Sequence, residues 1–151
     1  MNHYLYYPGC SMDSSARAYR DSLAAVGGRL GIEFAEIEDW NCCGATEYLS
    51  VSLTPAYALI ARNLALAERQ MDGSRTLVAS CSACYLNLAK TDHYMQESPS
   101  LGQRVNLALA AGGLRYHPGA VEVRHLLDVI VHDHIIIGRE GHVSLKAKGL
   151  I

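Results

Sequence analysis

The sequence predicts an α/β fold: a small parallel sheet with flanking helices, and cysteines in loops at the carboxyl ends of successive strands. Strand-like and helix-like segments alternate in the order β-α-β-α-β-α, which is typical of a parallel sheet covered by helices. The length of 151 residues and the apolar content of 50% fit one compact domain. In addition, each of the first three predicted strands leads into a segment that contains cysteine.

The first predicted strand is the aromatic stretch of residues 4–7, which a Pro-Gly turn ends. Either Ser14 or Ser15 can act as the N-cap residue of the helix that follows, and Gly31 ends this helix. Apolar residues recur in it at intervals of three and four, namely Ala16, Tyr19, Leu23, Val26 and Leu30. Residues 32–37 alternate between apolar and acidic types, which predicts the second strand.

The second helix is predicted to begin with Thr54 as its N-cap residue and Pro55 at its first helical position. An Asp-Gly-Ser turn at residues 72–74 ends it. Its buried face is expected to comprise Ala56, Ile60, Leu64, Ala67 and Met71. Residues 76–79 are apolar and predict the third strand.

The remaining part of the chain has shorter patterns. A helical pattern covers residues 85–95 and breaks at Pro99, and a further helix ends at residues 112–113. Residues 121–123 fit a short fourth strand. The apolar pattern of residues 126–137 predicts a last helix.

The five cysteines form the most specific pattern in the sequence: Cys10, the adjacent pair Cys42 and Cys43, and the Cys-x2-Cys pair Cys81 and Cys84. Each group follows one predicted strand. In open α/β sheets ligands bind beyond the carboxyl ends of the strands, so we expect the three groups to converge on one edge. The sequence therefore predicts a single five-cysteine site.

Composition restricts the class of protein. A formal charge of −2 gives no electrostatic reason to expect a nucleic-acid partner. We find no apolar run that could span a bilayer and no signal-peptide pattern, so a cytoplasmic location is expected. Persistent disulfides are rare in the cytosol, and an odd number of cysteines cannot pair completely within the chain. Metal binding or redox chemistry is the expected role of the cysteines.

Thiolates bind both iron–sulfur clusters and zinc. Two adjacent cysteines fit poorly into one tetrahedral zinc site, whereas neighbouring thiolates can bind different irons of a cluster. Gly44 follows the adjacent pair and allows the close backbone approach that a bound group needs. An iron–sulfur site is therefore favoured. A thioredoxin-like redox pair at residues 81–84, a structural zinc site and unrelated buried cysteines stay open as alternatives.

Other residues give weaker signals. The seven histidines show no pattern that pairs them with the cysteines. His132 and His134 flank Asp133 and could bind a metal ion, but their place late in an apolar helical pattern favours a structural or surface role. Trp40, two residues before the cysteine pair, is expected to be a core or lid residue. Tyr85 could shield a cluster from solvent.

Three segments resemble the cysteine-rich CCG domain of the heterodisulfide reductase B-subunit family: residues 7–11 (Tyr-Pro-Gly-Cys-Ser), 40–44 (Trp-Asn-Cys-Cys-Gly) and 81–85 (Cys-Ser-Ala-Cys-Tyr). Residues 123–128 also resemble the connection between the two domains of that family. The resemblance implies that residues 1–151 form a single CCG domain, about half of a full-length two-domain member of the family. The chain would then be either one domain of a longer protein or a natural one-domain protein.

In that family each complete set of five cysteines holds a noncubane [4Fe-4S] cluster. The resemblance thus implies the cluster ligands Cys10, Cys42, Cys43, Cys81 and Cys84. It implies an oxidoreductase that acts on sulfur groups within a multisubunit complex, where the cluster transfers electrons to a disulfide or to carrier-bound sulfur. No catalytic residue is expected apart from the cluster, and aerobic preparation can remove the cluster.

The resemblance also implies partners, which are a second CCG domain and the other subunits of the reductase complex. Dimerisation of the isolated domain is an alternative. The same domain occurs in iron–sulfur subunits of glycolate oxidases, of lactate-utilisation proteins and of certain fumarate reductases. An electron-transfer role without direct contact to a sulfur substrate therefore stays open.

Overall fold

The computed structural model describes residues 2–12, 14–45, 48–130, 135–138, 141–144 and 147–148. Its centre is a four-stranded sheet in the order β2-β1-β3-β4. The strands are β1 (Asn2–Tyr7), β2 (Ile32–Glu36), β3 (Thr76–Ala79) and β4 (Glu122–His125). All neighbouring strands pair in parallel, which confirms the predicted α/β fold. The four carboxyl ends consequently lie along one edge of the sheet.

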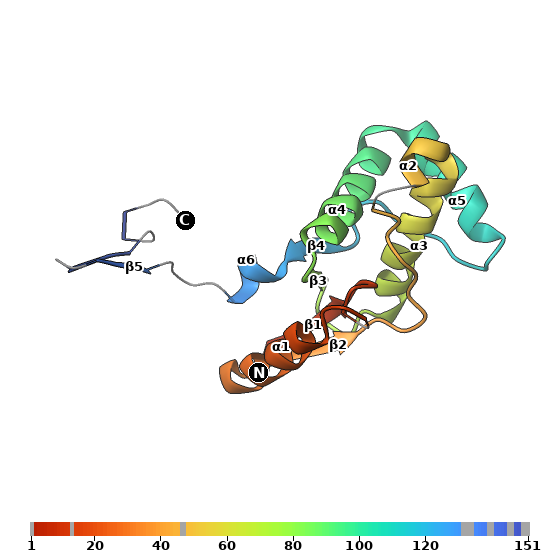
Figure 1. Ribbon diagram of the computed structural model, residues 1–151. Helices are drawn as coiled ribbons and strands as arrows, with labels where there is room; N and C mark the ends of the chain where they lie inside the picture. The colour runs from red at the N-terminus through yellow and green to blue at the C-terminus, as the bar shows by residue number, and fades with distance from the viewer. Residues whose placement is uncertain are drawn as a thin grey trace.

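The helices are α1 (Arg17–Leu30), α2 (Tyr48–Val51), α3 (Leu53–Gln70), α4 (Ser82–Glu97), α5 (Pro99–Ala110) and α6 (Leu126–Ile130). In Figure 1, α3, α4 and α5 gather on one side of the sheet, and α1 lies away from them beside β1 and β2. Among the described residues, no helix combines the length and the apolar character that a bilayer crossing would require.

Side chains alternate along β1 and divide the core into two clusters. Leu5 and Tyr7 belong to the larger cluster, together with buried residues of α3, α4 and α5 such as Leu64. Tyr6 belongs to the smaller cluster, where it packs with residues that include Leu23 of α1. The predicted buried positions of α3 are correct for Ala56, Ile60, Leu64 and Ala67, whereas Met71 is half-buried.

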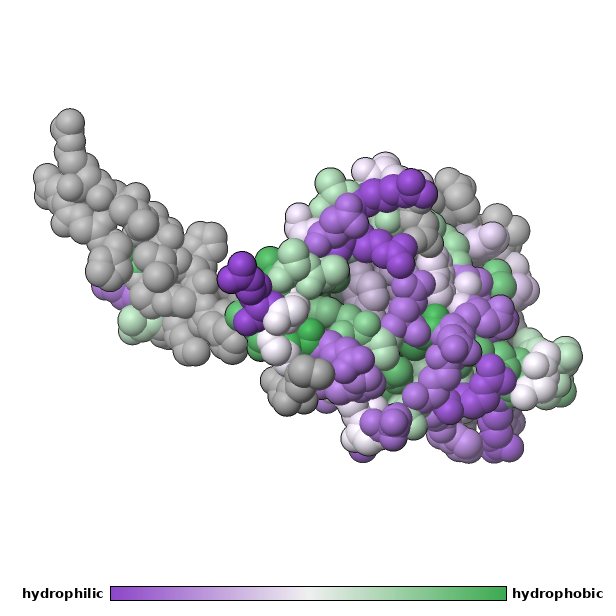
Figure 2. Space-filling view, turned by 90° about the horizontal axis from the view of Figure 1, so that it is seen from below, coloured by the Kyte–Doolittle hydropathy of each residue, from purple (hydrophilic) through white to green (hydrophobic). Residues whose placement is uncertain are grey.

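The apolar series of α1 is mostly at the surface. Leu23 is buried, but Tyr19, Val26 and Leu30 are 42%, 45% and 51% exposed. Figure 2 shows hydrophobic residues between hydrophilic ones on the face that it presents. The helices α1 and α6 each add one buried residue to the smaller cluster, Leu23 and Leu126, while α3, α4 and α5 cover the larger one.

Two helices begin differently from the prediction. Neither Ser14 nor Ser15 caps α1, whose N-cap position is occupied by an alanine. The Ser14 hydroxyl instead donates to the backbone oxygen of Cys10 at 3.1 Å, in the turn after β1. In α3, Thr54 and Pro55 lie inside the first turn instead of starting it. Proline is tolerated there because first-turn N–H groups have no partner within the helix.

The prediction of one helix over residues 126–137 is wrong in its second half. The helix α6 ends at Ile130, and β5 (Ile135–Gly138) pairs antiparallel with β6 (Gly141–Ser144). Three consecutive β-branched isoleucines favour extended backbone, which explains the change. Figure 1 shows this hairpin beyond α6. The predicted His132-Asp133-His134 feature lies outside the described residues.

Candidate metal centre

Three adjacent strands deliver the five cysteines to the carboxyl edge of the sheet. Cys10 follows β1, Cys42 and Cys43 follow β2, Cys81 follows β3, and Cys84 lies in the first turn of α4. Because β2, β1 and β3 are neighbours and run in parallel, their carboxyl ends meet at one edge. Segments that are far apart in the sequence therefore meet here.

Four of the five sulfur atoms form two close pairs at different depths. The Sγ atoms of Cys43 and Cys84 are 3.3 Å apart, and both residues are buried. The Sγ atoms of Cys10 and Cys42 are 3.7 Å apart, and both residues are exposed. Cys81 has intermediate exposure, and all five are free thiols. The site therefore has a buried floor and a solvent-facing rim.

The thiols perturb one another. Hydrogen bonding with Cys84 lowers the pKa of Cys43 to about 6, and bonds from the backbone of Ala45 and the side chain of Asn87 act in the same direction. The same bond to Cys43, followed by burial and by the charges of Cys43 and Cys81, raises the pKa of Cys84 well above its ordinary value. Of the two buried thiols, Cys43 is therefore the more acidic, and deprotonated sulfur is the form that binds metal.

Two glycines next to the cysteines occupy positions where a side chain would not fit. Gly9 precedes Cys10 with φ +77°, and a Cβ atom there would lie 3.0 Å from the Sγ of Cys84. Gly44 follows the adjacent pair with φ +64°, and a Cβ atom there would overlap the ring of Tyr48. A larger residue would be strained at either position and would displace its neighbour.

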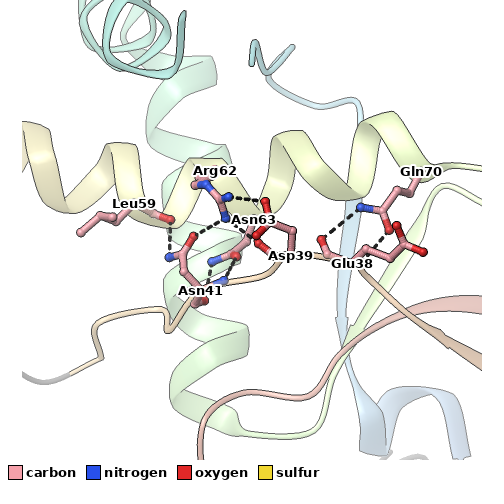
Figure 3. A network of polar contacts seen from close by, with 7 residues as sticks. All are labelled: Glu38, Asp39, Asn41, Leu59, Arg62, Asn63 and Gln70. Atoms are coloured by element: carbon pink, nitrogen blue, oxygen red, sulfur yellow. Dashed lines mark hydrogen bonds and ion pairs between the residues drawn. The ribbon is translucent and has the colours of Figure 1, made fainter. Parts of the chain in front are cut away.

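Asn41 fixes the position of the cysteine pair through the helix α3 (Figure 3). Its backbone N–H donates to Asn63 Oδ1 at 2.9 Å, and its backbone oxygen accepts from Asn63 Nδ2 at 3.0 Å. Its own side chain donates to the backbone oxygens of Cys42 and Leu59 and accepts from Arg62. The contacting residues 59, 62 and 63 share one face of α3, because they are three and four positions apart.

Tyr7 connects this loop to the sheet. Its hydroxyl donates to the backbone oxygen of Asn41 at 2.8 Å. Burial is the first cause that raises the pKa of Tyr7, and the neighbouring thiolates of Cys43, Cys84, Cys42 and Cys10 raise it further. Trp40 packs edge-on against Tyr7 with the ring centroids 5.5 Å apart and is half-buried, as expected for a core or lid residue. Tyr7 thus lies within electrostatic reach of four of the five cysteines.

His125 contacts the segment between Cys81 and Cys84, although no sequence pattern associates a histidine with the cysteines. It is the last residue of β4 and pairs in register with Ala79, the last residue of β3. Its Nε2 atom lies 3.2 Å from Ser82 Oγ, between Cys81 and Cys84 in sequence. Tyr85 packs edge-on against its ring at 5.7 Å. The predicted fourth strand, residues 121–123, ends two residues before His125, whereas the observed strand ends at it.

The donor set fits an iron–sulfur cluster. Five thiols are present, and two of them are adjacent in sequence. A cluster spreads its ligands over several irons, so it can accept paired sulfurs at two depths. Within the part of the chain that the structure describes, no three Cys, His, Asp or Glu side chains are gathered in a group that would hold a single metal ion.

Comparisons with known proteins agree with this architecture. The chain is 32% identical over 130 residues to the 8-methylmenaquinol:fumarate reductase membrane anchor subunit of Wolinella succinogenes. The aligned segment covers 86% of this chain and 44% of that protein. It is 24% identical over 131 residues to the B-subunit of the ferredoxin:CoB-CoM heterodisulfide reductase of Methanosarcina mazei, and this alignment covers 86% of this chain and 42% of that protein. The chain therefore spans less than half the length of these relatives.

A solved structure of a hypothetical protein from Helicobacter pylori shares the fold, with a TM-score of 0.72 and 16% identity over 90% of this chain and 27% of that one. The family model of the cysteine-rich CCG domain matches residues 4–89, which include all three cysteine groups. The chain belongs to the cysteine-rich CCG domain family.

Proposed function

We propose that this chain is the iron–sulfur domain of a heterodisulfide reductase-like thiol:disulfide oxidoreductase. The proposed ligands of its noncubane [4Fe-4S] cluster are Cys10, Cys42, Cys43, Cys81 and Cys84. The observation that carries the proposal is the convergence of these cysteines on one sheet edge, with Sγ–Sγ distances of 3.3 Å and 3.7 Å in the two pairs. The similarity to the B-subunit of a heterodisulfide reductase supports the reaction class.

The chain has a distinct task at each depth of this site. The buried Cys43 and Cys84 lie where water is excluded, which strengthens electrostatic interactions with a bound group. The exposed Cys10 and Cys42 border the side from which a disulfide could arrive. When bound, the cluster would supply electrons and an iron site for a sulfur atom. Two electrons added to a disulfide break its S–S bond and leave two thiolates.

A second candidate function is electron transfer within a fumarate reductase type of complex. The observation in its favour is that the fumarate reductase relative is 32% identical to this chain, compared with 24% for the heterodisulfide reductase relative. In that case the cluster would pass electrons onward without contacting a sulfur substrate. A structural zinc module is the third alternative, and metal analysis distinguishes it from both.

The proposed partners are a second CCG domain and the other subunits of a reductase complex. Both relatives are named as reductase subunits, and each is more than twice as long as the segment that this chain matches. The isolated domain could instead dimerise through surface that a second domain would cover. We propose a cytoplasmic location because free thiols are stable in a reducing compartment.

An activity assay with the cluster-loaded chain tests the proposed function. One domain provides a metal partner for one product sulfur, and the second sulfur needs another site. We therefore expect negligible disulfide reduction by the chain alone and recovery of activity when a second CCG domain is supplied. Full turnover by a monomeric chain would show that one cluster suffices. If electrons are exchanged with a redox dye but no disulfide is reduced with the second domain present, the electron-transfer function is correct.

A further inference from the structure

The carboxyl edge of the sheet contains one side chain to which the proposed function gives no role. In the order β2-β1-β3-β4, the first three strands lead to cysteines, and the fourth ends at His125. His125 is half-buried and lies next to the loop between Cys81 and Cys84, through its contact with Ser82. The four strands of the sheet therefore each contribute a chemically active side chain to the same edge.

The hydrogen bonds of His125 determine where its proton lies. The backbone N–H of Leu127 donates to His125 Nδ1 at 3.2 Å, so Nδ1 is an acceptor and carries no hydrogen. The neutral ring then carries its hydrogen on Nε2, which lies 3.2 Å from Ser82 Oγ. The backbone N–H of His125 donates to Asp128 Oδ2 at 3.3 Å, which holds the turn into α6. The ring orientation is thereby fixed.

This arrangement excludes one direction for the Ser82 hydroxyl hydrogen. Because Ser82 Oγ accepts from His125, its own hydrogen points away from the histidine and is available to another acceptor. Ser82 is exposed and stands in the first turn of α4, one residue after Cys81. A nucleophilic serine would need a histidine with an unprotonated Nε2 atom, and here Nε2 carries the hydrogen. The pair is arranged to donate a hydrogen bond and not to attack a substrate.

We propose that the Ser82 hydroxyl, oriented by His125, donates a hydrogen bond to the anionic sulfur of a thiolate bound at the five-cysteine edge. This inference rests on the proposed function, since disulfide reduction leaves thiolates at that edge. A pre-oriented donor stabilises the negative charge on sulfur without reorganisation. Ser82 would contact the ligand, and His125 is a positioning residue that acts through Ser82.

Four single variants distinguish hydrogen-bond donation by the Ser82 hydroxyl from structural support of the cysteine loop. Ser82→Ala removes the hydroxyl, and Ser82→Thr retains it. His125→Asn retains an acceptor near the Nδ1 position but does not reach Ser82, and His125→Gln places an amide N–H near the Nε2 position. Iron content, sulfide content and the resting EPR spectrum of each loaded variant report whether the cluster site is intact.

The first measurement needs no cluster. In the metal-free, ¹⁵N-histidine-labelled chain, NMR should show the Nε2–H tautomer for His125. An Nδ1–H tautomer would overturn the proposal, because Ser82 would then be the donor toward the histidine.

The second measurement is a titration of the cluster-loaded chain with 2-mercaptoethanol, followed by its EPR spectrum. We expect about tenfold weaker thiolate binding for Ser82→Ala and His125→Asn, and near wild-type binding for Ser82→Thr and His125→Gln. The double variant Ser82→Ala/His125→Asn should bind no more weakly than either single variant.

Unchanged thiolate binding by Ser82→Ala would overturn the proposal. Loss of iron and sulfide from the Ser82→Ala and His125→Asn variants would also overturn it, because the pair would then support the cysteine loop. Failure of the wild-type chain to take up iron and sulfide would contradict the proposed function and the thiolate role with it. That failure is recognised before any variant is compared.

Discussion

The side-chain amide of Asn63 and the backbone of Asn41 form a closed pair of hydrogen bonds, 2.9 Å and 3.0 Å long. Asn63 is completely buried in the middle of α3, where an apolar residue would be the usual occupant. The Asn63 amide makes the two backbone hydrogen bonds that a neighbouring strand would make, and the loop at Asn41 has no such strand beside it among the described residues. The cysteine pair after Asn41 is therefore attached to a helix and not only to the end of β2.

This relationship predicts that Asn63→Ala destabilises the domain. The backbone N–H of Asn41 would lose its partner, and its backbone oxygen would keep only the Tyr7 hydroxyl, so the free energy of unfolding should fall by roughly 2 kcal/mol. Urea unfolding of the metal-free chain measures this change. Loading with iron and sulfide should also decrease, because the cysteine pair would no longer be held in place.

Gln70 provides a matched control for Asn63. Its side chain makes the same two bonds to the backbone of Glu38, at 2.7 Å and 3.3 Å, but on the exposed part of the loop (Figure 3). Water can replace these bonds, so Gln70→Ala should cost less than about 1 kcal/mol. Equal costs for the two variants would contradict a special role of Asn63.

Gly9→Ala tests the close approach between the backbone and Cys84. The variant has a φ of +77° to maintain and a Cβ atom at 3.0 Å from Cys84 Sγ, so it should both destabilise the fold and impair cluster loading. Gly73→Ala is the control, because Gly73 also has a positive φ of +81° but has no atom within 4 Å of an added Cβ. Both variants should lose about 1 kcal/mol from backbone strain. If the Gly9→Ala variant takes up iron and sulfide as well as the Gly73→Ala variant, the close approach of the Gly9 backbone to Cys84 has no role in cluster binding.

The adjacent cysteines can be tested one at a time. Cys42→Ser and Cys43→Ser each replace a thiolate by a harder oxygen donor, so each should impair cluster assembly or alter its EPR signal. Circular dichroism of the metal-free variants should remain that of the wild type, since serine is close to cysteine in size. Normal iron and sulfide contents in both variants would mean that the adjacent pair does not bind the cluster.

Much of the fold could be predicted from the sequence. The β3 bounds are as predicted, and β1, β2 and β4 differ by two residues or fewer at each end. The short helix α2 was not predicted, because four residues are too few for a periodic pattern. The last helix was overextended because an apolar run of isoleucines fits a buried helix or a strand equally well by periodicity.

The site was predictable in part. The placement of the cysteines after strands followed from topology, because parallel strands share a carboxyl edge. Asn63 was missed because a helical pattern identifies apolar residues and passes over one polar residue among them, although a lone asparagine on such a face was a usable signal. His125 was missed because β4 is short, and its contact with Ser82 depends on strand order that the sequence does not contain.

Iron and acid-labile sulfide analysis of the anaerobically prepared chain, together with its EPR spectrum, tests the central claim most directly. The proposal predicts about four irons and four sulfides per chain and an EPR signal that changes in the Cys43→Ser variant. One zinc per chain without sulfide, held by four of the five thiolates, would contradict it and establish a structural metal site instead.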